Sequence, residues 1–368
     1  MRPGPTPGGH LPHGWAGLML LIPLIGGCQR PVDQAASAPQ SFSIVVLPDS
    51  QSYVDRSPLV FSSQVHWIAR HIHQNNIAFV SHLGDVVERD CPEQWSVADR
   101  ILTPLDRAVP YGLAFGNHDL GGDSHGAHPR RRPFGTRRFL RQPWYGGGWG
   151  DNACSYQLFS ACGLDFVVVH LVCNAPDEAL GWADHVLERH ADRRAIVVTH
   201  MYLGLLARDQ PARGRCRWSK LFGSHGNTPQ QMWEKCFRRH PNVFLILCGD
   251  QSGVQAFRQS SRGEHGNRVH EVLSDYGRDS RGLSGYLRIY RFRPRYNVIE
   301  VQTYSPYRHR FCEGTPLVPD REAHAFALPY CMTRTPWTRR AGTSDQRRIL
   351  ETGEGCAVPL AIRTSGSQ

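Results

Sequence analysis

The sequence predicts an α+β fold in which two mixed β-sheets pack face to face and helices cover their outer faces. Between residues 42 and 240, short apolar runs alternate with amphipathic helical patterns, as they do in βαβ units. From residue 243 onward, strand patterns dominate. With 368 residues, 40% of them hydrophobic, the chain is long enough to bury one large core.

The expected elements follow one another in a regular order along the chain. A helix begins at Ser57-Pro58, because Pro suits a first helical turn, and Phe61, Val65 and Ile68 follow it at helical spacing. Residues 120–152 are rich in Gly, Pro, His and Arg and predict a long loop. Strands are expected at 44–47, 77–83, 111–115, 164–170, 194–199, 244–248, 254–257, 268–273, 286–292 and 298–303, and helices from 57 and at 93–109, 179–190 and 229–239.

The N-terminus has the pattern of a targeting segment. Its apolar run, 17–25, is too short for a stable membrane span and ends in Gly26-Gly27-Cys28, which resembles a bacterial lipobox. We expect a lipoprotein signal peptide at 1–27, a lipid on Cys28 as the membrane anchor, and a polar tether at 28–40. An ordinary signal peptide with a chance Cys is the alternative. The folded domain is expected at 41–331 and a loose tail at 332–368.

Export of the chain would permit disulfides between some of its 11 Cys residues. Cys154 with Cys162 and Cys312 with Cys331 are plausible pairs, although the sequence does not fix the connectivity. The net charge of +10 comes almost entirely from Arg, which can bind an anionic substrate. No basic helix or aromatic-interleaved stripe is present, so we expect no specific nucleic-acid binding.

Short polar strings come directly after several of the expected strands. Since ligands bind at the carboxyl edge of strands in open α/β sheets, these strings predict one shared site. Their Asp, Asn and His side chains are donors for one or two cations. The strings are Asp49-Ser50-Gln51, Gly84-Asp85, Gly116-Asn117-His118-Asp119, Thr199-His200 and Gly249-Asp250-Gln251-Ser252.

The order of these strings resembles that of the calcineurin-like metallophosphoesterases. Their pattern is Asp-x-His, Gly-Asp, Gly-Asn-His-Asp or Glu, an isolated His, and Gly-His-x-His. The resemblance covers about residues 42–328 and implies a four-layer αββα sandwich of two mixed sheets. A bacterial exported branch commonly opens with Asp-Thr-Gln, which accounts for Gln51. The fifth string departs from the pattern, because Asp250 and Ser252 stand where two His are usual.

The resemblance implies two divalent metal ions, with Mn, Mg, Fe or Zn as candidates. Asp85 would bridge them, and Asn117, His200 and Asp250 would complete the ligands of one ion. The other ion would be held by Asp49 and Gln51, with Ser252 as a poor additional ligand. Oxygen donors alone favour Mg²⁺, Mn²⁺ or Ca²⁺ over Zn²⁺, so this second site is expected to be weak.

The resemblance also implies roles outside the metal ligands. His118 would act beside the leaving-group oxygen as a general acid or as a charge-stabilising donor, with Asp119 holding its ring. Trp144, Tyr145 and Asn152, in the long loop, would shape the substrate pocket. The alternative for these three residues is a Gly-rich turn whose aromatic side chain packs inward.

The sequence therefore predicts an exported, metal-dependent hydrolase of phosphate esters in the cell envelope, monomeric and acting on a small phosphorylated substrate. Phosphomonoester, phosphodiester, nucleotide and phospholipid headgroup all remain possible substrates. The rival prediction is a non-catalytic envelope lipoprotein on the same fold with a degraded metal site. The altered fifth string favours the rival, whereas Asp49, Asp85, Asn117-His118-Asp119 and His200 favour the enzyme.

The lipid anchor can be tested by replacing Cys28. Cys28→Ala should release the protein from membrane fractions or block its maturation, because the lipid would be the only membrane attachment. Fractionation and the mass of the mature protein measure this directly. Unchanged fractionation together with an unchanged mature mass would show that Cys28 carries no lipid.

Overall fold

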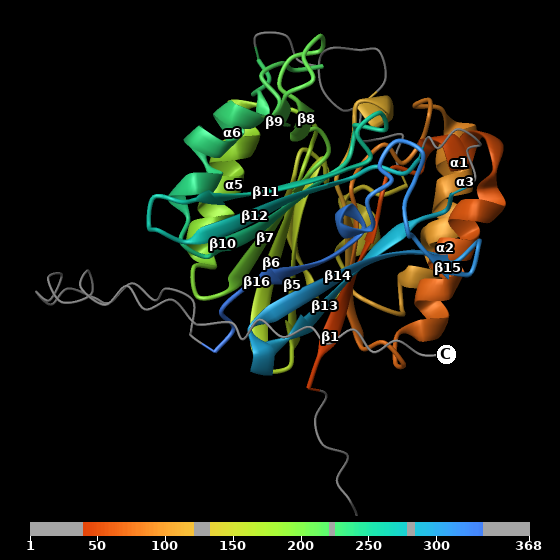
Figure 1. Cartoon of the computed structure of the whole chain (residues 1–368), viewed down its shortest axis with the longest axis horizontal. Coiled ribbons are helices and arrows are strands. Elements are labelled where there is room, and N and C mark those ends of the chain that lie inside the picture. The colour runs from red at the N-terminus through yellow and green to blue at the C-terminus, as the bar shows by residue number, and fades with distance from the viewer. Residues whose placement is uncertain (1–39, 121–132, 221–224, 278–283, 334–368) are drawn as a thin grey trace, which may run out of the picture. The chain divides into compact units, whose positions relative to one another are not determined.

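The computed structural model describes residues 40–120, 133–220, 225–277 and 284–333, all of which lie in the compact unit 38–368. Two seven-stranded mixed sheets pack against each other in this unit (Figure 1). The first sheet contains β1 (Phe42–Leu47), β2 (Ile77–His82), β3 (Tyr111–Leu113), β13 (Leu287–Arg293), β14 (Val298–Ser305), β15 (Arg310–Phe311) and β16 (Ala325–Pro329). The second contains β4 (Tyr145–Trp149), β5 (Cys154–Ala161), β6 (Leu164–Leu171), β7 (Arg194–Thr199), β10 (Val243–Cys248), β11 (Ala256–Arg262) and β12 (Arg268–Ser274).

Both sheets have a parallel centre and antiparallel edges. The first runs in the order β15-β14-β13-β1-β2-β3, with β16 also paired to β14, and the second in the order β11-β12-β10-β7-β6-β5-β4. β1, β2 and β3 are parallel to one another, as are β6, β7, β10 and β12. The carboxyl ends of the parallel strands therefore share one edge within each sheet.

Helices cover the outer face of each sheet (Figure 1). α1 (Gln51–Arg56), α2 (Pro58–His71) and α3 (Pro92–Leu102) lie on the first sheet, and α5 (Asp177–Arg189) and α6 (Pro229–Lys235) lie on the second. Pro occupies the first turn of α2, α3 and α6, where its missing N–H costs nothing. The predicted four-layer αββα sandwich is thus confirmed.

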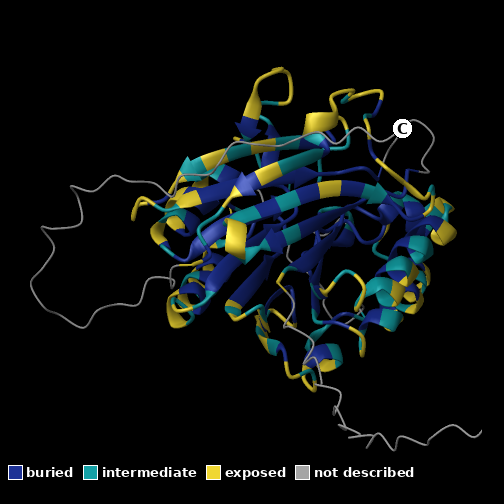
Figure 2. Cartoon of the chain, turned by 60° about the horizontal axis from the view of Figure 1, so that its bottom comes forward, coloured by how far each residue is buried: buried dark blue, intermediate teal, exposed yellow. Residues whose placement is uncertain are grey.

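An aromatic core fills the space between the sheets. Along β1, Phe42, Ile44 and Val46 point into this space, whereas Val45 and Leu47 point toward the helices, as the period of two in a strand requires. The ring of Phe166 lies 5.5 Å from that of Phe42 and 4.8 Å from that of Phe159, between ring centroids. Figure 2 shows the central strands of the sheets mostly in the colour of buried residues, whereas some of the other strands also carry exposed ones.

Most elements agree with the sequence prediction, and the differences lie in short or glycine-rich segments. The segment predicted as a long loop contains α4 (Thr136–Phe139) and β4, whose Gly146-Gly147-Gly148 hides the strand pattern. The helix expected at 93–109 ends at Leu102, followed by a short 3₁₀ turn. The two-stranded ribbon β8 (Leu203–Leu205) and β9 (Arg213–Arg215) was not expected.

The suggested disulfides are wrong for the described cysteines. Cys154 and Cys312 are both free thiols, so neither suggested pair forms. Cys154 begins β5 and Cys162 follows its end, so an eight-residue strand separates them. At about 3.3 Å per residue, that distance greatly exceeds the reach of a disulfide.

The predicted signal peptide, Cys28, most of the tether and nearly all of the tail lie outside the described residues. Among the helices that the structure describes, none has both the length and the apolar character needed to span a bilayer.

The inter-sheet core can be tested at Phe166, which is completely buried. Phe166→Ala should lower the free energy of unfolding by about 3–5 kcal/mol, because it leaves a cavity among four other Phe rings. Phe311→Ala is the control, since Phe311 is 49% exposed, and it should change stability by less than about 0.5 kcal/mol. Urea denaturation measures both, and equal losses would contradict the assigned core.

Candidate metal centre

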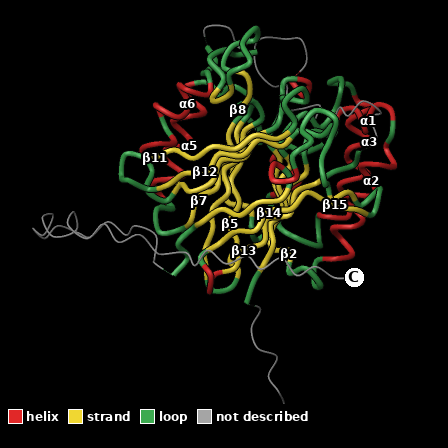
Figure 3. The backbone as a smooth tube through the Cα atoms, in the orientation of Figure 1, coloured by secondary structure: helices red, strands yellow, loops and turns green. Residues whose placement is uncertain are grey.

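The predicted ligands come from loops that follow parallel strands. Asp49 follows β1 and Asp85 follows β2 in the first sheet, whereas His200 follows β7 and Asp250 follows β10 in the second. Asn117 follows β3. Figure 3 shows loops gathered at one end of the sandwich, beyond the strands.

Asp49, Asp85 and His200 form a compact buried group. Each is at most 2% exposed, and one ligand atom from each lies within 4.8 Å of the others. His200 Nε2 lies 3.2 Å from Asp85 Oδ2. His200 Nδ1 lies 3.1 Å from the Leu83 carbonyl oxygen, which can only accept, so Nδ1 donates there and Nε2 faces the carboxylates.

Three buried polar atoms at this point have no hydrogen-bond partner of suitable geometry within the described part of the chain: Asp49 Oδ1, Gln51 Oε1 and His200 Nε2. The Gln51 amide donates through Nε2 to Asp85 Oδ2 at 3.2 Å, which leaves its Oε1 without a donor. Unpaired buried acceptors are costly. Carboxylate oxygen, amide oxygen and imidazole nitrogen are all donors to divalent ions, so these residues fit a metal.

The charges of this group act on one another. Burial raises the pKa of Asp49 well above its usual value, and repulsion from Asp275 adds to the effect. Burial also opposes ionisation of Asp85, but the charge of His200 outweighs it and lowers the pKa. Burial lowers the pKa of His200, but the charges of Asp85 and Asp49 outweigh that effect and raise the pKa well above its usual value. A proton or a metal ion at His200 Nε2 can therefore offset the carboxylates.

Asp250 and Asn117 have a different partner, Lys220. The Lys220 ammonium hydrogen-bonds to Asp250 Oδ1 and lies 3.5 Å from Asn117 Oδ1. Asp250 Oδ1 lies 3.5 Å from His200 Nε2, so the lysine adjoins the compact group. Burial would lower the pKa of Lys220, but Asp250 outweighs it and raises the pKa.

Lys220 is a site residue that the sequence prediction missed. No polar string or strand end marks it, since it lies in the long connection after β8 and β9. The one feature of the sequence that distinguishes Lys220 is the scarcity of lysine: Lys220 and Lys235 are the two lysines among 42 Lys and Arg residues.

Asp275 is a second residue without a predicted role. It directly follows β12, another parallel strand, and is 2% exposed. One carboxylate oxygen accepts the Gly277 N–H at 3.1 Å, and burial raises the pKa of Asp275 to about 6. Its position after a parallel strand is the same signal that marked Asp49 and Asp85.

Glycines allow the ligand loops to approach one another closely. A Cβ on Gly249 would lie 2.0 Å from Asp49 Oδ1, and one on Gly116 would lie 2.1 Å from Asp85 Oδ1. Asp85 and Asp250 also have positive φ values of 48° and 73°, a conformation that non-glycine residues keep only where the surroundings enforce it. The backbone conformation therefore brings the loops that carry the carboxylates close together.

A buried chain of hydrogen bonds joins the first two ligand loops. His82 Nδ1 accepts the Gly84 N–H at 3.2 Å, so Nε2 donates to Ser50 Oγ at 3.0 Å, which donates to the Val86 carbonyl at 3.1 Å. Burial, with the charge of His200, lowers the pKa of His82 to about 3, so its ring stays neutral. This chain fixes the loop of Asp49 against the loop of Asp85.

His118 lies at the exposed side of the group. Its backbone N–H donates to Asp85 Oδ1 at 3.0 Å, and its Nε2 lies 3.9 Å from Asp85 Oδ2. Its Nδ1 lies 2.9 Å from the Glu88 carbonyl, which can only accept, so Nδ1 donates. With a side chain that is 28% exposed, His118 leaves Nε2 available to a substrate.

Asp119 accepts hydrogen bonds from the backbone of two loops. One carboxylate oxygen accepts the Val87 N–H at 3.0 Å and the other accepts the Gly116 N–H at 2.8 Å. The Glu88 carbonyl also orients the His118 ring, and the role of Asp119 in holding that ring stays a prediction. Asp119 thus fixes the loop that carries Asn117 and His118.

Trp144, Tyr145 and Asn152 lie together in a packed aromatic cluster. Trp144 is 9% exposed, and its ring centroid lies 5.6 Å from that of Tyr111. Tyr145 donates to Asn152 Oδ1 at 2.8 Å, and Asn152 Nδ2 donates to a backbone carbonyl at 2.8 Å. Trp144 and Asn152 are therefore buried whereas Tyr145 is partly exposed, and a role of these residues in shaping a substrate pocket stays a prediction.

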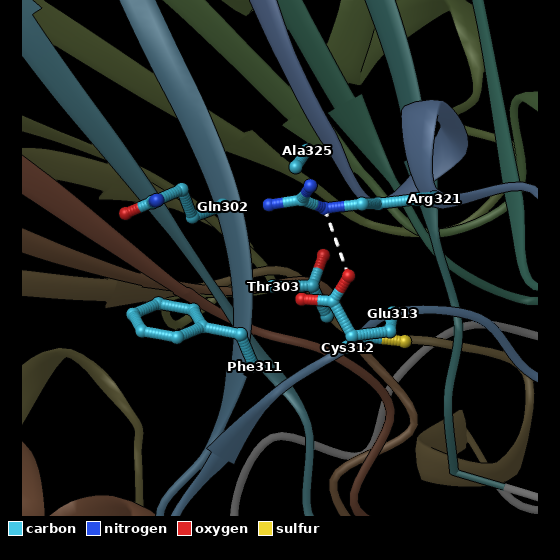
Figure 4. Close-up of a pocket in the computed structure, with 7 residues that line it drawn as sticks. All are labelled: Gln302, Thr303, Phe311, Cys312, Glu313, Arg321 and Ala325. Atoms are coloured by element: carbon cyan, nitrogen blue, oxygen red, sulfur yellow. Dashed lines mark ion pairs between the residues drawn. The ribbon is translucent and has the colours of Figure 1, made fainter. Parts of the chain in front are cut away.

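A small cavity lies beside the edge strands of the first sheet and contains none of the predicted site residues (Figure 4). An ion pair between Arg321 and Glu313, 2.9 Å from Nε to Oε2, crosses it. The residues that line it are Gln302, Thr303, Phe311, Cys312, Glu313, Arg321 and Ala325.

Comparison with protein families identifies the family of this chain. The calcineurin-like phosphoesterase model matches residues 43–251, more than half of the 368-residue chain. This stretch includes the predicted ligands Asp49, Gln51, Asp85, Asn117, His200 and Asp250. The chain belongs to this family. The resemblance inferred from the polar strings is therefore confirmed.

Individual relatives of this chain are more distant. The uncharacterized protein YvnB of Bacillus subtilis (strain 168) is 30% identical over 283 residues, which are 75% of this chain and 21% of YvnB. The chain thus spans about a fifth of the length of that relative.

Among solved structures, GAP50 of Plasmodium, an anchor in the inner membrane complex, has a TM-score of 0.44 and 9% identity over 80% of this chain and 90% of GAP50. The NAD nucleotidase NadN of Haemophilus influenzae has a TM-score of 0.40 and 10% identity, and the match covers 73% of this chain and 48% of NadN. The 5'-nucleotidase precursor of Thermus thermophilus has a TM-score of 0.37 and 12% identity, and the match covers 80% of this chain and 56% of the nucleotidase. None of these values assigns a substrate to this chain.

The close glycine contact gives a test of the phosphoesterase centre. Gly249→Ala should weaken Mn²⁺ binding by about 10–100-fold, because its Cβ would displace Asp49 Oδ1. Gly253→Ala is the matched control, since a Cβ there meets nothing within 4 Å, and it should bind Mn²⁺ as the parent does. Isothermal titration with Mn²⁺ measures both, and unchanged binding in Gly249→Ala would remove Asp49 from the ligands.

Proposed function

We propose that this phosphoesterase hydrolyses small phosphomonoesters or phosphodiesters in the cell envelope, as an exported, lipid-anchored monomer. The observation that carries the proposal is the convergence of Asp49 Oδ1, Gln51 Oε1 and His200 Nε2, three buried donor atoms without hydrogen-bond partners, in a member of a metal-dependent family. The export and the anchor are supported by the sequence pattern around Cys28.

The donor set favours a hard cation. Asp49, Asp85 and Gln51 offer oxygen, and His200 alone offers nitrogen, which suits Mn²⁺ or Mg²⁺ better than Zn²⁺. When bound, such an ion supplies Lewis-acid stabilisation of the phosphoryl oxygens and lowers the pKa of water. The neutral His82 chain and the backbone contacts of Asp119 keep the ligand loops in register without adding charge to the site.

His118 has the geometry of a general acid. Its Nδ1 is used by the Glu88 carbonyl, so Nε2 is the nitrogen that can give a proton to the departing alcohol oxygen. Its backbone N–H binds Asp85, which fixes the distance between the imidazole and the metal ligands. The partial exposure of the ring gives a substrate access from solvent.

Three variants test this function with separate readouts. Asp85→Asn and His200→Ala should each lower the content of Mn²⁺ and abolish hydrolysis, because each removes a metal ligand. His118→Asn should lower turnover by about 10²–10⁴-fold and leave the Mn²⁺ content unchanged, because it removes only acid catalysis. Chromogenic phosphomonoester and phosphodiester assays with added Mn²⁺, together with metal analysis, measure these effects.

His185→Asn is the control, since His185 lies exposed on α5, and it should match the parent in both readouts. A His118→Asn variant that loses as much Mn²⁺ as His200→Ala would make His118 a ligand and contradict its role. A parent protein that binds Mn²⁺ but hydrolyses neither class of ester would favour the non-catalytic lipoprotein.

A further inference from the structure

Lys220 occupies a position that the family pattern gives to a metal ion. Its ammonium contacts Asp250 Oδ1 and lies 3.5 Å from Asn117 Oδ1, which are the donors that the resemblance assigned, with Asp85 and His200, to one of two ions. An ammonium and a divalent ion that share these two oxygens would lie a few ångströms apart. At that distance, repulsion between like charges costs several kcal/mol even at an effective dielectric constant of about 20.

The backbone holds Lys220 in this place. Its N–H donates to Asn174 Oδ1 at 3.2 Å, and the Asn174 amide in turn donates to the Asn227 carbonyl at 3.1 Å. Asn174 is completely buried and has a positive φ of 49°. The segment that carries Lys220 is therefore attached to a fixed point of the second sheet's loops, unlike that of a solvated surface lysine.

Asp250 and Asn117, which bind Lys220, differ from the other predicted ligands in their hydrogen bonds. The atoms without hydrogen-bond partners belong to Asp49, Gln51 and His200, whereas the oxygens of Asp250 and Asn117 are used. Of the six predicted ligands, three thus have donor atoms without a hydrogen-bond partner among the described residues, and two bind an ammonium group. The sixth, Asp85, accepts hydrogen bonds from Gln51 and from the His118 N–H. The same division accounts for the altered fifth string, because a carboxylate pairs with Lys whereas a neutral His would not.

We propose that Lys220 supplies the second positive charge of this centre, so that the protein binds one divalent ion, on Asp49, Gln51, Asp85 and His200, in place of two. This inference rests on the proposed function. Asp250 and Asn117 then position Lys220 and are not metal ligands. The ammonium group offers a point-charge contact to a phosphoryl oxygen of the substrate, a role that Lys serves in other phosphate sites.

The test is the number of Mn²⁺ ions bound by the full mature chain. The parent should bind one Mn²⁺, with the electron paramagnetic resonance spectrum of an isolated ion. Lys220→Met should bind a second Mn²⁺ and show the spin coupling of two neighbouring ions, because the donors of Asp250 and Asn117 become free. Lys235→Met is the matched control, since Lys235 lies at the end of α6 in an exposed ion pair with Asp177, and it should bind one.

The outcomes separate this inference from the proposed function. A parent that binds two Mn²⁺ ions, or a Lys220→Met variant that still binds one, overturns the inference and leaves the function intact. A parent that binds no Mn²⁺ and hydrolyses no phosphoester overturns both.

A second measurement needs no variant. Acetylation of the parent by a water-soluble reagent, followed by mass spectrometry, should label Lys220 at least tenfold more slowly than Lys235, with and without Mn²⁺. If Mn²⁺ raises the labelling of Lys220 to the rate of Lys235, the ion displaces the lysine and the inference is wrong.

Discussion

Buried negative charge is the constraint on which the centre depends. Asp49, Asp85 and Asp275 are at most 2% exposed, and the Asp250 side chain is fully buried. Burying carboxylates is unfavourable unless cations or hydrogen-bond donors offset them. Here His200 and Lys220 supply part of the positive charge, backbone N–H groups supply hydrogen bonds, and atoms without partners remain where an ion fits.

Much of this centre could be predicted because it follows from strand ends. A buried parallel strand is a short apolar run, and the first polar residue after it lies at the ligand edge whatever the rest of the chain does. Asp49, Asp85, His200 and Asp250 were found in this way, and the sheets followed from the same runs. Asp275 could have been found too, since it follows β12 directly.

The other features depend on contacts between residues distant in sequence, which no local pattern encodes. Lys220 meets Asn117 across 103 positions, by way of a connection whose course the sequence does not indicate. Asp119 binds the backbone of Val87, on the loop of a neighbouring strand, which its position beside His118 in the sequence did not indicate. Gly146-Gly147-Gly148 read as a flexible turn, yet they belong to β4, where Gly147 and Gly148 pair with β5.

The two ends of the sandwich are filled in opposite ways. Phe42, Phe166 and Phe244 lie near the starts of their parallel strands, so the bulky rings gather at one end. At the other end, Gly84 and Gly116 pack on His200, and Gly249 packs on Asp49, at distances that exclude even a methyl group. Because Asp49 and Asp85 belong to one sheet and His200 to the other, a bound ion would act as a cross-link between the sheets at the end away from these Phe rings. Loss of the ion would then loosen that end alone, and amide hydrogens at the carboxyl ends of the strands would exchange faster while those beside the rings would not.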